Sequence, residues 1–118
     1  MSSIFDLEQK DEVYIVNLHL PQIDMFNVTE LLEDFKDLVE KKPANVVLNL
    51  KETSFVDSSG MGGLIRIHQQ VKGYDGQFSI ANLNTKVANL MRITRSSQYL
   101  TCYDTMDDAL KAIKKASQ

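Results

Sequence analysis

The sequence predicts an α/β protein in which about four helices pack on a mixed β-sheet. Two strand-like segments joined by a polar break open the chain, which indicates an antiparallel hairpin. Helical and strand-like segments then alternate to the end, which favours mostly parallel strands joined by right-handed crossovers. The length of 118 residues, with 43% hydrophobic and 25% charged residues, fits one globular domain over residues 1–118.

The opening hairpin is predicted between Ile4 and Leu20, with residues 9–12 as its polar break. In the second segment, every other residue from Tyr14 to Leu20 is apolar, which is the period-two pattern of a half-buried strand. Pro21 follows this segment, and we expect it to end the strand because proline has no N–H to donate.

The first helix is predicted to begin at Asn27, a favoured N-cap residue that has Glu30 three positions later, as in a capping box. Phe26 and Leu31 occupy the positions of a hydrophobic staple. Pro43 ends the helix. The apolar residues of its buried face are Val28, Leu31, Leu32, Phe35, Leu38 and Val39.

Strands and helices alternate in the rest of the chain. The predicted strands are 46–50, 77–81 and 99–103. The first of these is almost entirely apolar, which is typical of an interior strand covered on both faces. The predicted helices begin near Ser58, at Asn84 and at Thr105, and Asp108 completes a capping box with Thr105.

Composition excludes several classes of function. The net charge of −3 and the pI of about 5.3 argue against a nucleic-acid-binding protein, which needs a basic face. The single cysteine, Cys102, rules out an internal disulfide or a cysteine-rich zinc site. No apolar run approaches the roughly 18 residues of a membrane helix, and the first residues lack the features of a signal peptide. We therefore expect a cytoplasmic protein without a membrane partner.

The most unusual segment is Phe55–Leu64. Three of the five glycines of the chain, Gly60, Gly62 and Gly63, lie within four positions at a predicted helix start. Each glycine inside a helix costs about 1 kcal/mol of stability relative to alanine, so the presence of glycine at these positions requires an explanation. Two explanations remain open: close packing of the helix on the sheet, and a surface kept clear so that a partner can reach Ser58.

Asp57 and Ser58 are residue types that favour the N-cap, and capping alone is a sufficient reason for them. A phosphate on Ser58 would add a charge of about −1.5 to −2 beside the positive end of the helix dipole. The helix should tolerate that charge. Phosphorylation would then leave the fold intact and change only what can dock on this surface.

The enzyme motifs that we tested are incomplete. A nucleophile elbow fails because Val56 or Met61 stands where a glycine is needed. A dinucleotide fingerprint fails at Ile65. His68 lies about 15 Å along the predicted helix from Ser58, too far to act as its base. Histidine is scarce, since the sequence has two.

The sequence predicts neither a metal site nor a cofactor. Asp24 and Asp57 should meet at one edge of the sheet, but two carboxylates without a histidine or cysteine are a weak Mg²⁺ signal. His19 ends a predicted strand and is expected to be half-buried, whereas His68 should line the core-facing edge of its helix.

The strand 46–50, followed by Phe55-Val56-Asp57-Ser58-Ser59-Gly60-Met61-Gly62, resembles the core of the STAS domain. It is most similar to the bacterial anti-sigma factor antagonists, in which an apolar strand and a short connection precede Asp-Ser-Ser/Thr-Gly-Leu/Met at a helix start. The resemblance extends over nearly the whole chain in element order and length. It implies a mixed sheet covered by helices and a protein that is not an enzyme.

The resemblance also implies a partner-switching role. The unphosphorylated protein would bind a serine-kinase anti-sigma factor of the histidine-kinase-like ATPase fold and so release a sigma factor. The kinase would phosphorylate Ser58, and a PP2C-type phosphatase would reverse this. The partner-binding residues implied by the family motif are Asp24, Asp57, Ser59, Gly60, Met61 and Gly62.

Two other classes stay open at this point. The first is a non-switching STAS module, either a stressosome-type scaffold or an accessory subunit of a transport complex. A scaffold should carry an N-terminal sensor domain, and a transport accessory should lack the acceptor serine that Ser58 supplies. The second is a small hydrolase that uses Ser58, against which the missing base argues.

Overall fold

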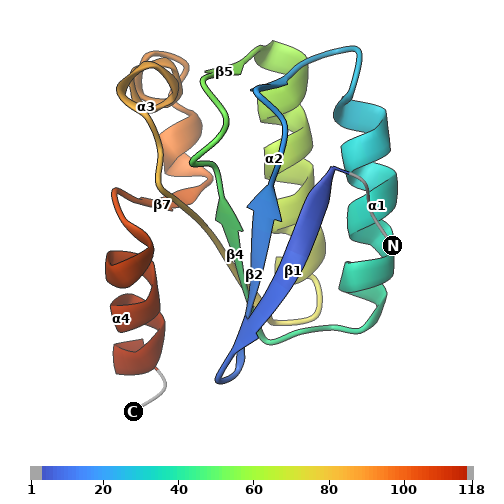
Figure 1. The fold of residues 1–118 in the computed structure, drawn as a ribbon, viewed down its shortest axis with the longest axis vertical. Coiled ribbons are helices and arrows are strands. Elements are labelled where there is room, and N and C mark those ends of the chain that lie inside the picture. Colours follow the sequence, from blue (N-terminus) through green and yellow to red (C-terminus); the bar gives the residue numbers. More distant parts are fainter. Residues whose placement is uncertain (1–3, 117–118) are drawn as a thin grey trace.

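The structure, a computed structural model, describes residues 4–116 (Figure 1). Its main sheet has five strands in the order β1-β2-β4-β6-β7. β1 and β2 pair antiparallel, whereas the other neighbouring strands pair parallel, so the predicted mixed sheet is confirmed. The strands are β1 (Phe5–Lys10), β2 (Val13–Leu18), β4 (Asn45–Asn49), β6 (Gln77–Ala81) and β7 (Thr101–Tyr103).

Four α-helices cover this sheet, as predicted. Figure 1 shows α1 and α2 next to each other, with α4 on the other side of the strands. A short 3₁₀-helix, Ser96–Gln98, precedes β7, so the last strand is shorter than the predicted 99–103. The α-helices are α1 (Val28–Glu40), α2 (Ser58–Lys72), α3 (Thr85–Ile93) and α4 (Met106–Ala116).

The strand β4 divides the apolar core into two parts, because its side chains alternate between the faces of the sheet. Val46 and Leu48 join the larger cluster, which includes Phe35 of α1. Val47 joins a smaller cluster that includes Ala109 of α4. The strand is therefore buried on both faces, as its almost continuous apolar sequence predicted.

A second, two-stranded parallel sheet was not predicted. It pairs β3 (Gln22–Ile23) with β5 (Phe55–Val56), in the register Gln22↔Phe55 and Ile23↔Val56. Two residues are too few to show a strand period, so this sheet could not be predicted from local patterns. This small sheet joins the segment before α1 to the segment before α2.

The prediction for the start of α1 was partly wrong. Asn27 occupies the N-cap position but makes no side-chain cap; its Oδ1 instead accepts a hydrogen bond from the Asp24 N–H at 2.9 Å. Phe26 is 88% exposed and therefore forms no hydrophobic staple. The caps of the later helices are confirmed: the Val87 N–H donates to Asn84 at 2.8 Å, and the Asp108 N–H donates to Thr105 Oγ1 at 3.0 Å.

Candidate functional site

The candidate site is built around the N-terminus of α2. Asp57 is its N-cap: the backbone there is extended, and the Oδ1 atom accepts a hydrogen bond from the Gly60 N–H at 2.7 Å. Ser58 and Ser59 follow in the first turn, and both are exposed. The cap therefore satisfies one backbone donor of the helix while leaving the Ser58 side chain on the surface.

Asp57 also fixes the position of the neighbouring loop. Its second oxygen, Oδ2, accepts a hydrogen bond from the Met25 N–H at 3.1 Å. Its backbone N–H donates to the Ile23 carbonyl at 3.0 Å. A single residue thus holds the start of α2 against the loop that precedes α1.

Asp24 organises that loop from within. It is only 8% exposed, and its Oδ1 accepts hydrogen bonds from the N–H groups of Phe26 and Asn27 at 2.9 and 3.2 Å. Its Oδ2 accepts from the Gln22 side chain at 2.6 Å. The Asp24 carboxylate therefore makes its hydrogen bonds within the loop, where it holds the backbone of Phe26 and Asn27 in place.

Asp24 and Asp57 do lie in contacting segments, as predicted, and Met25 connects them. Each carboxylate is occupied by N–H donors from the protein itself. Among residues 4–116, no group of three histidine, cysteine or acidic side chains is arranged to hold a metal ion.

The three clustered glycines have different surroundings. A Cβ added at Gly60 would overlap the backbone carbonyl of Ile23, and one added at Gly63 would overlap the Val28 side chain. At Gly62 an added Cβ would have no neighbouring atom within 4 Å. Close packing therefore explains two of the glycines. The third faces open space, so packing within the described chain does not explain it.

Exposed apolar side chains lie on the segments next to the start of α2. Met25 is 63% exposed and Phe55 is 51% exposed, in addition to Phe26. In Figure 1, β5, α3 and the start of α2 lie at the same end of the molecule. A groove of about 140 Å³ opens there, and its lining residues are Phe55, Val56, Asp57, Ser58, Met61, Leu90 and Thr94.

Sequence reasoning missed this apolar surface. Met25, Phe55 and Leu90 were not named as site residues, and Phe26 was assigned to the packing of α1. No sequence signal was available, because β5 has only two residues; the structure shows that its extended backbone places Phe55 opposite the buried Val56.

The two histidines differ in environment. His68 packs against Phe78, with ring centroids 6.4 Å apart, which confirms its place on the core-facing side; burial, then Lys72, lowers its pKa. His19 is exposed rather than half-buried, so that prediction was wrong. Its Nε2 lies 2.7 Å from Asp6 Oδ2, and its Nδ1 lies 2.8 Å from Glu52 Oε2. These hydrogen bonds, Asp6 first, raise the pKa of His19.

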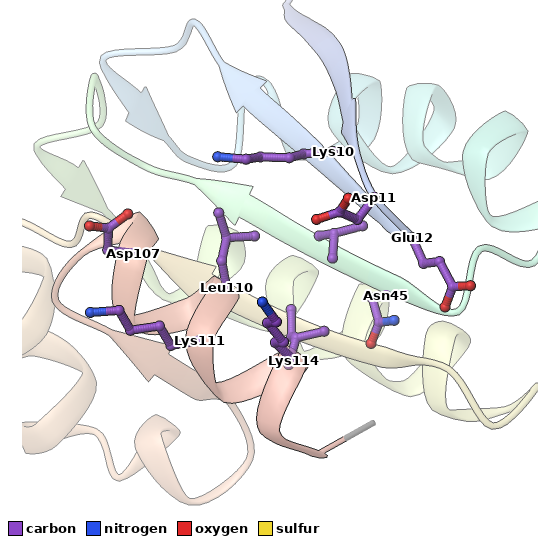
Figure 2. Close-up of a pocket in the computed structure, with 10 residues that line it drawn as sticks. Lys10, Asp11, Glu12, Asn45, Asp107, Leu110, Lys111 and Lys114 are labelled. Atoms are coloured by element: carbon purple, nitrogen blue, oxygen red, sulfur yellow. The ribbon is translucent and has the colours of Figure 1, made fainter. Parts of the chain in front are cut away.

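A larger cavity, of about 640 Å³, lies away from Ser58 (Figure 2). It separates the turn of the first hairpin from α4 and has an apolar floor of Val13, Leu110 and Ile113. Its rim carries acidic and basic side chains in equal number, so it offers no selective charge to a ligand. The charged rim residues are Lys10, Asp11, Glu12, Asp107, Lys111 and Lys114.

Comparison with known proteins identifies the family. The STAS domain model matches residues 5–109. This chain belongs to the STAS family. STAS domains of the anti-sigma factor antagonist type are a regulatory, non-enzymatic fold, which agrees with the incomplete enzyme motifs. No helix within residues 4–116 combines the length and apolar character that a membrane span requires.

Curated relatives of this STAS chain carry related names. The anti-sigma-B factor antagonist of Bacillus subtilis is 29% identical over 89 residues, which cover 75% of this chain and 80% of the relative. The anti-sigma F factor antagonist of Paenibacillus polymyxa is 26% identical over 73 residues, covering 62% of each chain.

Solved structures confirm the STAS fold. A crystal structure of a proposed anti-sigma factor antagonist from Thermotoga maritima superposes with a TM-score of 0.83 at 21% identity, covering 95% of this chain and 96% of that one. The unphosphorylated form of the antagonist SpoIIAA gives a TM-score of 0.74 at 18% identity, covering 94% and 96%.

Proposed function

We propose that this STAS domain is an anti-sigma factor antagonist that binds its anti-sigma factor through the surface around Ser58. The observation that carries this proposal is an exposed serine at the start of α2, bordered by exposed apolar side chains. The names of the relatives from Bacillus subtilis and Paenibacillus polymyxa support the same role. Because sigma factors act on RNA polymerase, the proposed compartment is the cytoplasm.

The apolar surface supplies a driving force for docking. Met25, Phe26 and Phe55 all expose more than half of their area. Fully burying one large apolar side chain contributes about 1.5–3 kcal/mol, and about 1.4 kcal/mol corresponds to a tenfold change in affinity. A partner that covers these side chains therefore has enough apolar contact to bind specifically. The groove between Phe55 and Leu90 would accept one of its side chains.

Gly62 supports close approach by that partner. Nothing inside the described chain occupies the space beside it, so the fold does not require a glycine there. An exposed glycine in a helix still costs about 1 kcal/mol relative to alanine. A partner backbone that packs against the first turns of α2 would account for this otherwise unexplained residue.

A phosphate on Ser58 would switch the complex off. In the free protein, the N-terminus of α2 favours the added negative charge. In the complex, the same dianion would be enclosed against apolar side chains and beside the nucleotide of a kinase partner. Desolvation and like-charge repulsion there are expected to cost several kcal/mol, without any change of fold.

In this scheme the partner is a serine kinase of the histidine-kinase-like ATPase fold, and a PP2C-type phosphatase regenerates the free form. Asp57 and Asp24 position the surface, and Ser59 and Gly62 form the rest of the exposed helix start. Gly60 and Met61 are buried, so Gly60 would contribute by packing against Ile23 and Met61 by lining the groove beside Ser58. The alternative of a non-switching scaffold or transport accessory gives no role to the exposed Ser58.

The test is to incubate the protein with the candidate kinase and ATP and to locate phosphate by peptide mass spectrometry. We expect phosphate on Ser58 and none after Ser58→Ala. In the control Ser59→Ala the phosphate should still be found on Ser58, whatever the rate at which it is added. Calorimetric titration with the kinase should show tight binding before phosphorylation and at least tenfold weaker binding afterwards. Phosphate on another residue, or equal affinity of both forms, would overturn the proposal.

A further inference from the structure

The side chain of His19 lies between two carboxylates from different parts of the fold. Asp6, on β1, faces Nε2 at 2.7 Å, and Glu52, in the loop between β4 and β5, faces Nδ1 at 2.8 Å. We propose that His19 is a protonation-controlled clamp that fixes the two segments presenting Ser58. This regulation lies beyond the proposed binding function and does not depend on the identity of the partner.

The geometry requires the imidazolium form. A neutral imidazole has one N–H donor and one acceptor nitrogen, whereas both nitrogens here face oxygens that only accept. Asp6 is held in this orientation because its other oxygen, Oδ1, accepts a hydrogen bond from the Asn17 amide at 2.9 Å. Loss of a proton from the ring would leave a nitrogen lone pair directed at a carboxylate, and that contact would open.

The clamp lies at the base of two paired segments. The segment 19–24 leads through β3 to the Asp24 loop, and the segment 52–57 leads through β5 to the cap of α2. Hydrogen bonds join them beyond His19 and Glu52. Thr53 Oγ1 donates to the Leu20 carbonyl at 2.7 Å, the Ser54 N–H and Oγ donate to the Pro21 carbonyl at 2.9 and 3.3 Å, and the Asp57 N–H donates to the Ile23 carbonyl at 3.0 Å.

The charged groups that act on the ring are Asp6 and Glu52, and both favour its cationic form. The adjacent Asn17, on the same face of β2, is neutral. Because the pKa of His19 is raised by folding, its contribution is complete below the unfolded value of about 6.5 and is lost as pH rises through the folded value. All three side chains are exposed, so the effect should be local opening of the paired segments rather than global unfolding.

The test is an NMR titration of the full chain from about pH 5 to about pH 9, which spans the range in which histidines change charge. The protein has two histidines, so both imidazole signals can be followed. We expect the midpoint of His19 to lie above 6.5 and that of His68 below it. Backbone amide signals of Ser54 and Asp57 should shift with the His19 midpoint. A His19 midpoint at or below 6.5 would overturn the proposal.

Two variants distinguish a specific contact between His19 and Glu52 from a general effect of removing a negative charge. Glu52→Gln should lower the His19 midpoint and remove the pH response of Ser54 and Asp57. The matched control is Glu8→Gln, an exposed carboxylate on the same face of β1 as Asp6, which should leave the midpoint unchanged. An equal shift in both variants would contradict a specific clamp.

Amide exchange gives a second readout that is independent of chemical shift. Protection factors, which are corrected for the intrinsic pH dependence of exchange, should fall at Ser54 and Asp57 by about twofold to fivefold across the His19 titration, the range of an exposed ion pair. Those of Val47 and Leu48, in the core of β4, should stay constant. Constant protection at Ser54 and Asp57 would refute the clamp and would leave the proposed binding function untouched.

Discussion

The first two turns of α2 have an inner side and an outer side that are built from similar small residues. On the inner side, Gly60 and Gly63 lie where a Cβ would overlap Ile23 and Val28. On the outer side, Ser58 and Gly62 are exposed, and Gly62 has open space beside it. The comparison shows that small residues in one motif can have different causes: those inside are required by packing, whereas no contact within the described chain requires those outside.

Gly60→Ala should have the largest effect on stability. The new methyl group would meet the backbone carbonyl of Ile23, which cannot rotate away as a side chain can. Overpacking of this kind costs about 1–3 kcal/mol, and a backbone obstacle places this variant near the upper end. Urea denaturation should therefore show a free energy of unfolding lower by about 3 kcal/mol. A loss below about 1 kcal/mol would show that β3 and α2 can separate without cost.

Gly63→Ala should have a smaller effect, because the obstacle is the Val28 side chain. We expect a net loss of about 1 kcal/mol, since the helix propensity of alanine offsets part of the overlap. The double variant with Val28→Ala provides the control. Its loss should be smaller than the sum of the single losses, and strict additivity would contradict a direct overlap.

Gly62→Ala should act in the opposite direction on stability. The free energy of unfolding should rise by about 0.5–1 kcal/mol, because alanine favours the helix and meets no atom in this chain. Binding of the anti-sigma factor, measured by calorimetry, should become weaker at the same time. If affinity were unchanged, the outer side of α2 would not be the docking surface proposed here.

Ser58→Asp should change stability least, by less than about 0.5 kcal/mol, because the position is exposed and a negative charge suits the helix N-terminus. Thermal unfolding would check this expectation. Kinase binding should nevertheless weaken at least tenfold, and Ser58→Asn serves as the uncharged control. Tight binding of the aspartate variant would refute a charge-based switch.

Much of the fold could be predicted because its signals are local and repeated. The alternation along β2 and the apolar run of β4 are read directly from the sequence, and both strands were confirmed. The pair β3 and β5 could not be predicted, because two residues show no period. The start of α1 was misread because Asn27 fits a capping box by spacing. In the structure, Asp24 accepts the Asn27 N–H that Glu30 would have accepted, and the Asp24 N–H occupies the Asn27 side chain.

Site residues could be predicted where they form a sequence motif. They could not be predicted where their position depends on tertiary contacts. Asp57 and Ser58 follow from helix-start preferences. The exposure of Phe26 depends on whether another part of the fold packs on it, and no local sequence pattern indicates that. His19 shows the same limit, because its partner Glu52 lies 33 positions away along the chain.

The two carboxylate oxygens of Asp57 bond to two different segments: one caps α2, and the other accepts a hydrogen bond from the Met25 amide. Ser58 and the exposed side chain of Phe26 therefore lie in segments that are held by the same residue. Under the proposed function, a partner that contacts Phe26 would be positioned relative to Ser58 by this one residue, so substitution of Asp57 would disturb binding and phosphorylation together.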